Sequence, residues 1–168
     1  LRRIAEIMPQ KNGFLMHGAV LSWSGEGYMF TAPSGTGKST HAALWRRYLG
    51  NEVEIINGDK PILKVIDNEV RIYGTPWAGK ERWQVNTSVP LNRICLLKRG
   101  QKTQLRQITA VEALPRLMQQ VYYTGDTKMA AKTMELLDTV FQNVPIYQLE
   151  CDVSEEAFRC SFTGMTGS

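Results

Sequence analysis

The segment APSGTGKST, residues 32–40, carries the residues with the clearest chemical meaning in this chain. Gly35 and Gly37 can adopt backbone conformations closed to residues with a Cβ atom, so successive N–H groups can curl around an anion. Lys38 adds a full positive charge, and the hydroxyl of Ser39 can ligate a magnesium ion. The segment therefore predicts a loop that binds the phosphates of a nucleotide.

The helix expected after this loop supports the same prediction. A helix over residues 39–49, ended by Gly50, would direct the positive end of its dipole at the bound phosphate. The usual pattern GxxxxGK[ST] is broken only at its first position, which is Ala32. A tight turn without a ligand is the alternative, and the run GTGKST after an apolar stretch argues against it. The expected nucleotide contacts are Ser34, Gly35, Thr36, Gly37, Lys38, Ser39 and Thr40.

Length and composition are those of an ordinary globular protein. The chain has 168 residues, of which 43% are hydrophobic and 21% charged, and we expect one domain over residues 1–168. Because it begins with Leu1 rather than Met, a fragment of a longer protein also fits the sequence. The net charge is +4, but the basic residues are scattered, so no nucleic-acid partner is expected.

Cysteine usage and hydropathy bear on the compartment. The three cysteines, Cys95, Cys151 and Cys160, lack CxxC spacing, which argues against a disulfide framework or a zinc site. We therefore expect a reducing, cytoplasmic location. No apolar run approaches the roughly 20 residues of a membrane-spanning helix, and no signal peptide is visible, so no membrane association is expected.

Two apolar runs ahead of the loop, residues 19–23 and 28–32, are separated by Ser-Gly-Glu-Gly and predict a β-hairpin. An ordinary parallel phosphate-loop domain would reach the strand before the loop through a longer crossover.

Further strands are predicted at 53–57, 62–66, 70–73, 93–98, 105–108 and 144–149, and further helices at 109–121, 126–141 and 154–162. Thr109 and Asp126 are suited to cap the first two of these helices, and Pro115 to bend the first. Met118, Met129 and Met134 are expected in the core.

The order of these features resembles the catalytic domain of the HPr kinase/phosphorylase family, whose nucleotide site is shared with phosphoenolpyruvate carboxykinases. The shared features are His17-Gly18, the hairpin, the loop with Lys38-Ser39, and an apolar strand followed by Asp59. The resemblance covers residues 14–59 well and extends loosely to residue 97. It implies an α/β mixed-sheet P-loop domain with a β-hairpin before the phosphate loop and helices in the C-terminal part.

The resemblance also implies roles for individual residues. Lys38 and the loop backbone would hold the triphosphate of ATP, while Ser39 and Asp59 would hold Mg²⁺. His17 would face the transferred phosphoryl group, so His17, Lys38 and Asp59 form the expected catalytic set. The family usually carries two adjacent aspartates here, the first of which assists deprotonation of the acceptor hydroxyl. Its counterpart in this chain is Gly58, which leaves His17 or a group of the substrate as the base.

Three functions fit this reading. The first is an ATP-dependent kinase that phosphorylates a serine-type hydroxyl in a peptide, a protein or a metabolite. The second is a nucleotide-binding sensor or assembly protein that has lost catalysis, which Gly58 would permit, and the third is a P-loop NTPase. The family's tendency to form oligomers makes a homo-oligomer an expectation as well.

Two further features lead to specific expectations. The segment YGTPWAGKE, residues 73–81, departs from the family signature that couples kinase and phosphorylase activity, so phosphorolysis is not expected. Trp77, Lys80 and Glu81 would form a wall of the site, or Trp77 would plug a packed surface loop, and both interpretations stay open. His41, just inside the predicted helix, is expected to face solvent.

Overall fold

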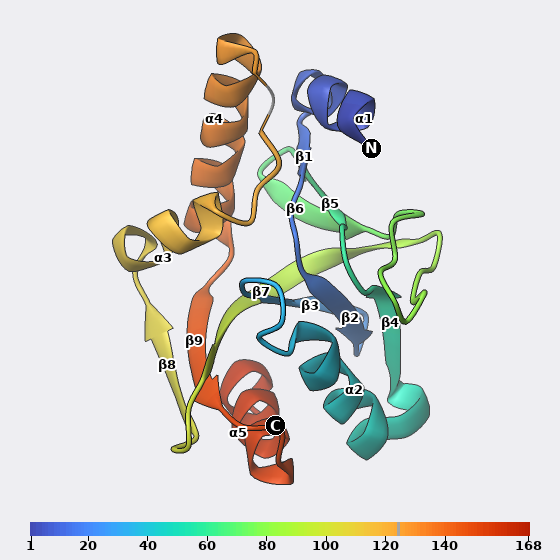
Figure 1. Ribbon diagram of the computed structural model, residues 1–168, viewed down its shortest axis with the longest axis vertical. Helices are drawn as coiled ribbons and strands as arrows, with labels where there is room; N and C mark the ends of the chain where they lie inside the picture. The colour runs from blue at the N-terminus through green and yellow to red at the C-terminus, as the bar shows by residue number, and fades with distance from the viewer. Residues whose placement is uncertain (124) are drawn as a thin grey trace.

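The computed structural model describes residues 1–123 and 125–168, which form a mixed sheet with helices on both faces (Figure 1). The strands are β1 (Gly13–Leu15), β2 (Ala19–Trp23), β3 (Glu26–Thr31), β4 (Val53–Asn57), β5 (Ile62–Ile66), β6 (Glu69–Tyr73), β7 (Ser88–Arg99), β8 (Gln104–Ile108) and β9 (Ile146–Cys151). The helices are α1 (Arg2–Ile7), α2 (Lys38–Leu49), α3 (Ala110–Met118), α4 (Thr127–Asn143) and α5 (Glu155–Thr166), with short 3₁₀ turns at Met8–Lys11 and Gly50–Glu52.

The long strand β7 joins two parts of the sheet. Its first residues pair antiparallel with β6, which leads through β5 to β1. Its later residues lie between β3 and β9 and run parallel to both. Because β2 is antiparallel to both β3 and β4, these two strands also run in the same direction. The carboxyl ends of β3, β4, β7 and β9 therefore meet at one edge, where open α/β sheets bind their ligands.

Alternating side chains of the central strands build one core on each face of the sheet. Met29 and Ile94 contribute to the core beneath α3 and α4, whereas Phe30 and Cys95 contribute to the core beneath α2 and α5. Successive strand residues point to opposite faces, which explains why these neighbours enter different cores. Figure 1 shows the two helix pairs on opposite sides of the sheet.

The predicted hairpin is confirmed. β2 and β3 pair with Trp23 opposite Glu26, which leaves Ser24 and Gly25 as a two-residue turn with φ angles of 54° and 79°. Positive φ at both turn residues matches the right-handed twist of the two strands. The other predicted strands and helices are present, with ends that differ by a few residues. The segment α1 to β1 was missed, and β7 begins at Ser88 rather than at residue 93.

The expectation that His41 faces solvent is wrong, because its side chain is only 3% exposed. Its Nε2 lies 2.8 Å from Ser161 Oγ, and its ring lies 4.7 Å from that of Phe30. Helix α5 packs on α2 and covers this position, a contact between distant parts of the chain. Burial lowers the pKa of His41 to about 4.

The expectation of a core position is also wrong for Met118, which is 36% exposed. Helix α3 turns Ala113 and Leu117 toward the sheet instead, so the methionine next to Leu117 falls on the outer side. Met129 and Met134 are half-buried on α4. Thr109 and Asp126 cap α3 and α4 as predicted.

We predict that Trp45→Ala lowers the free energy of unfolding by about 3 to 5 kcal/mol, because it leaves a large cavity beneath α2. Trp45 is fully buried, contacts the rings of Phe30 and Phe158, and donates a hydrogen bond to Ser161 Oγ at 2.9 Å. Urea denaturation followed by circular dichroism measures the loss. Val111→Ala, at a position 83% exposed on α3, is the control and should leave the midpoint nearly unchanged. Equal midpoints for both variants would contradict this account of the core.

Candidate functional site

The residues singled out in the sequence meet in one cavity of about 440 Å³ at the carboxyl ends of β3 and β4. Its lining residues are His17, Ser34, Gly35, Gly37, Lys38, Ser39, Thr40, Gly58, Asp59, Gly79, Lys80, Glu81 and Arg99. Thr36, the remaining predicted contact, belongs to the same loop but lines a neighbouring cavity. The structure thus brings together segments that lie far apart in the sequence.

The backbone of the glycine-rich loop is open toward this cavity. Gly35 and Gly37 have φ angles of 81° and 110°, and among the described residues no atom beyond the adjacent chain lies within 4 Å of a Cβ placed on either glycine. Gly37 is the N-cap of α2 and has no side chain with which to cap the helix. The first N–H groups of a helix have no intrahelical partner, and an anion satisfies them well.

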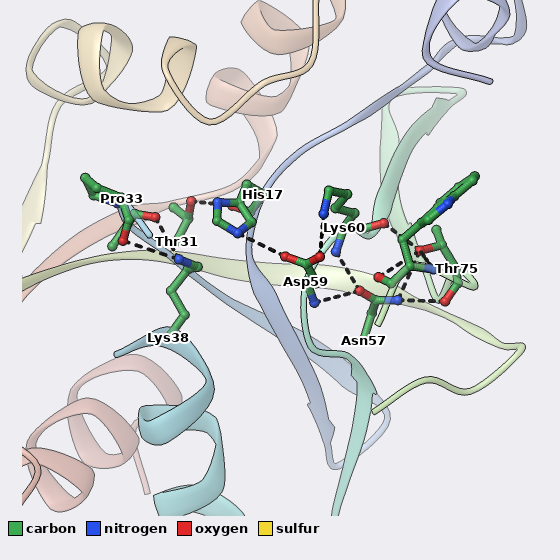
Figure 2. A network of polar contacts seen from close by, with 10 residues as sticks. His17, Thr31, Pro33, Lys38, Asn57, Asp59, Lys60 and Thr75 are labelled. Atoms are coloured by element: carbon green, nitrogen blue, oxygen red, sulfur yellow. Dashed lines mark hydrogen bonds and ion pairs between the residues drawn. The ribbon is translucent and has the colours of Figure 1, made fainter. Parts of the chain in front are cut away.

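The side chain of Lys38 folds back onto the start of the glycine-rich loop. Its side chain is largely buried, and its Nζ donates to the carbonyl oxygens of Ala32 at 3.0 Å and Pro33 at 3.4 Å (Figure 2). Burial lowers the pKa of Lys38, and the nearby charge of Asp59 opposes that shift. The ammonium group is therefore held by neutral acceptors at the rim of the cavity.

Arg99 is a residue of the site that the sequence reasoning missed. At the end of β7, it donates from Nη2 to the carbonyl of Gly35 at 2.6 Å and from Nε to that of Thr36 at 3.4 Å. It therefore ties the loop to the neighbouring strand and adds a positive charge to the cavity lining. The sequence held a local signal for this role, because a charged residue that directly follows a predicted apolar strand is expected at the edge of the sheet where ligands bind.

His17 and Asp59 form a pair on the opposite wall. Nε2 of His17 lies 3.0 Å from Oδ1 of Asp59, and Nζ of Lys60 lies 2.5 Å from Oδ2 of the same carboxylate (Figure 2). The backbone sets this arrangement, because the N–H of Gly18 donates to the carbonyl of Asp59 at 2.9 Å. The N–H of His17 donates to the carbonyl of Gln120 at 2.7 Å.

The charges around this pair favour a neutral imidazole beside an ionised Lys60. Burial and the charge of Lys38 lower the pKa of His17, although Asp59 and a hydrogen bond with Gln120 act in the opposite direction. Burial alone would lower the pKa of Lys60, but the hydrogen bond with Asp59, the charge of Asp59 and the interactions with Tyr122 together outweigh this effect, and the pKa is raised. A neutral imidazole beside a carboxylate is suited to accept a proton.

Asn57 holds the turn that carries Asp59, and the sequence reasoning did not assign it this role. Its buried Oδ1 accepts from the N–H of Asp59 at 2.9 Å and from that of Lys60 at 2.8 Å. Its Nδ2 donates to the carbonyl of Thr75 at 2.9 Å (Figure 2). An Asn at the end of a buried strand, directly before a glycine, is the local signal for such a turn.

The position of the family's first aspartate is occupied by Gly58 and covered by the loop after β6. A Cβ on Gly58 would lie 3.0 Å from the carbonyl oxygen of Ala78, and the N–H of Gly58 donates to the carbonyl of Trp83 at 3.0 Å. An aspartate would therefore require the loop to move. Glu81 of that loop supplies a second carboxylate to the cavity instead.

Both interpretations of segment 73–81 describe part of what is observed. Lys80 and Glu81 line the cavity as a wall of the site, whereas Trp77 does not line it. Trp77 is half-buried and its backbone is held by Thr75 and Lys60, through bonds of 3.3 Å and 3.2 Å. The segment is thus a packed loop whose later residues reach the site.

The donor types fit a magnesium ion that shares its coordination with phosphate. The hydroxyl of Ser39 and the carboxylates of Asp59 and Glu81 line the same cavity, and Mg²⁺ is usually bound by one or two carboxylates together with substrate phosphates. Among the described residues, no cluster of three or more His, Cys, Asp or Glu could hold a metal ion by itself. An ion here would therefore depend on the phosphates for part of its shell.

The structure also bears on the expectations for the cysteines and for a membrane-spanning helix. Cys95, Cys151 and Cys160 are free thiols. Within residues 1–123 and 125–168, no helix combines the length and the apolar character needed to cross a membrane.

Comparison with known proteins gives a family and a fold. The family model described as SynChlorMet cassette protein ScmC matches residues 1–160. Among solved structures, the Hpr(Ser) kinase/phosphatase from Coxiella burnetii superposes with a TM-score of 0.50 at 10% sequence identity, covering 88% of this chain and 91% of that chain. This likeness shows a shared fold. A search of curated proteins found no significant match.

We predict that Asn57→Ala lowers the free energy of unfolding by about 2 to 3 kcal/mol, because backbone N–H groups of the turn lose their acceptor. Chemical denaturation measures the effect, and Asn86→Ala at an exposed position serves as the control. If Asn57→Ala were as stable as Asn86→Ala, the turn would not depend on the amide of Asn57.

Proposed function

The chain belongs to the ScmC family of SynChlorMet cassette proteins, and we propose that it is an ATP-dependent phosphotransferase that acts on a hydroxyl group. One observation carries the proposal: the open glycine-rich loop with Lys38 and the His17–Asp59 pair line the same cavity. The fold shared with an Hpr(Ser) kinase/phosphatase supports phosphoryl transfer over other uses of such a cavity.

In this proposal, the triphosphate of ATP lies along the glycine-rich loop at the N-terminus of α2. The loop contributes backbone N–H groups from Ser34 to Thr40, and Lys38 contributes its charge. The carbonyl acceptors that Lys38 now contacts are neutral, so a bond to phosphate would be charge-assisted and stronger. Mg²⁺, held by Ser39 and Asp59 together with the phosphates, would neutralise charge on the transferred group.

The acceptor approaches from the side of His17. Its hydroxyl oxygen forms a bond to the terminal phosphorus while the bond from that phosphorus to the bridging oxygen of ADP breaks. The hydroxyl proton passes to the imidazole of His17, and the carboxylate of Asp59, 3.0 Å away, stabilises the resulting imidazolium. His17 thereby replaces the base that Gly58 cannot supply.

A nucleotide sensor without catalysis is the second candidate, and one observation favours it. The carboxylate of Asp59 is already engaged by Lys60 at 2.5 Å, and an acid at position 58 would require the loop after β6 to shift, since a Cβ there would lie 3.0 Å from the carbonyl oxygen of Ala78. Such a protein would bind ATP through the same loop and leave it intact.

Incubation of the purified chain with γ-labelled ATP, Mg²⁺ and pools of hydroxyl-bearing peptides and metabolites distinguishes the candidates. We expect label on an acceptor. Release of phosphate alone would indicate a P-loop NTPase, and binding without loss of label would indicate the sensor. Absence of ATP binding would contradict every function considered for this loop.

We predict that Lys38→Ala weakens ATP binding about tenfold to a hundredfold, because a charge-assisted contact worth about 1.5 to 3 kcal/mol is lost. Isothermal titration calorimetry gives the affinity. Lys102→Ala removes the same charge from an exposed position in the turn between β7 and β8 and should bind ATP as the wild type does. Equal ATP affinities for the two variants would show that the glycine-rich loop does not bind the phosphates of ATP.

We predict that His17→Ala lowers the rate of transfer about 10²-fold to 10⁴-fold, the range for loss of a positioned general base, while ATP affinity stays nearly unchanged. Single-turnover transfer and calorimetry measure the two effects separately. Transfer at the wild-type rate would show that another group takes the proton.

A further inference from the structure

A second cavity, of about 340 Å³, lies on the other side of the glycine-rich loop from His17 and Asp59. It shares Gly37 and Arg99 with the lining of the first cavity. Its volume falls within the range of about 300 to 1,000 Å³ that is typical of small-molecule sites. One ligand can therefore occupy both cavities by crossing the N-terminus of α2.

The walls of the second cavity differ in chemistry from those of the first. Leu44, Leu97 and Val153 present apolar surface, and Asp152 adds a carboxylate at the rim. Oδ1 of Asp152 accepts from the N–H of Ser154 at 3.0 Å, and the carboxylate, which has about four lone-pair sites, keeps further capacity to accept from a ligand. Lys98 and Arg99 line the side of the cavity next to the glycine-rich loop, so phosphate groups suit that side, whereas a flat ring with hydroxyl or amino donors suits the side formed by Leu97, Asp152 and Val153.

The fold places this cavity where the rest of a nucleotide would extend. Arg99 is the last residue of β7 and Cys151 the last of β9, so the cavity continues the edge formed by the carboxyl ends of the parallel strands. The loop with Lys38 follows β3 at the same edge, and Asp59 follows β4 on the far side. A triphosphate with its terminal group near Asp59 would extend toward β7 and β9.

We propose that this second cavity binds the nucleoside of the nucleotide, with the base against Leu97 and Val153 and a hydroxyl or amino group of the nucleoside donating to Asp152. The inference rests on the proposed function, because it assumes that the triphosphate occupies the first cavity. It adds a binding subsite and its residues to that function, with Gly37 and Arg99, which line both cavities, at the passage between them.

The test compares calorimetric affinities for ATP and inorganic tripolyphosphate, which share the phosphate chain but differ in the nucleoside. We expect the wild type to bind ATP at least about tenfold more tightly than tripolyphosphate. The double variant Asp152→Ala/Val153→Ala should lose about tenfold in ATP affinity and bind tripolyphosphate no more weakly than the wild type. Both positions are exposed, Val153 to 67%, so the fold should persist, and circular dichroism checks it.

A matched control removes the same two side-chain types elsewhere. Val111→Ala/Asp138→Ala changes exposed residues of α3 and α4, which cover the opposite face of the sheet, and should leave both affinities unchanged. Equal wild-type affinities for ATP and tripolyphosphate would overturn the nucleoside site while leaving the phosphate loop intact. An equal loss for both probes in the Asp152/Val153 variant would also overturn it. Failure of the wild type to bind either probe would overturn the proposed function itself.

Discussion

The backbone hydrogen bond from Gly18 to the carbonyl of Asp59 holds the candidate site together. It fixes the start of β2 against the end of β4 at a crowded point, because a Cβ on Gly18 would lie 2.5 Å from Cε of Met29 and 3.0 Å from the carbonyl of Phe30, so a larger residue would displace the methionine and press on the backbone of β3. The hydroxyl of Thr31 donates to the carbonyl of His17 at 2.7 Å, which links the same point to the strand that enters the glycine-rich loop. The distance between the His17–Asp59 pair and Lys38 therefore follows from main-chain packing at one crowded position.

The helix behind the loop is held just as firmly. Trp45 of α2 packs with Tyr28 and Phe30 of the sheet and with Phe158 and Phe162 of α5, at ring distances between 5.2 Å and 6.0 Å. Such a packed aromatic cluster resists displacement, since any shift of α2 would open a cavity. The N-terminus of α2 and the loop before it are thus presented to a ligand from a rigid base, which reduces the ordering cost of binding.

Cationic groups hold the carbonyl side of the loop. Lys38 donates to Ala32 and Pro33, and Arg99 donates to Gly35 and Thr36. Because these carbonyl oxygens are engaged, the loop offers a ligand mainly its N–H groups and the positive charges of Lys38 and Arg99. The carboxylate of Asp59 is in turn balanced by Lys60, so the arrangement as a whole favours a polyanion accompanied by a divalent cation.

The sequence by itself determined the features that depend on neighbouring residues. The hairpin of residues 19–32, the glycine-rich loop and the caps at Thr109 and Asp126 were all predicted, although the turn is two residues long and not four, because φ preferences and capping act over a few residues. Only the tertiary structure decided which side chains meet: Arg99 reaches Gly35 across 64 positions and His41 reaches Ser161 across 120. No local pattern encodes such pairs, since they arise where strand order brings distant chain segments to the same edge and where α5 covers α2. The same long-range packing left Met118 exposed and placed Gly58 next to the carbonyl of Ala78, where a side chain would require the loop after β6 to shift.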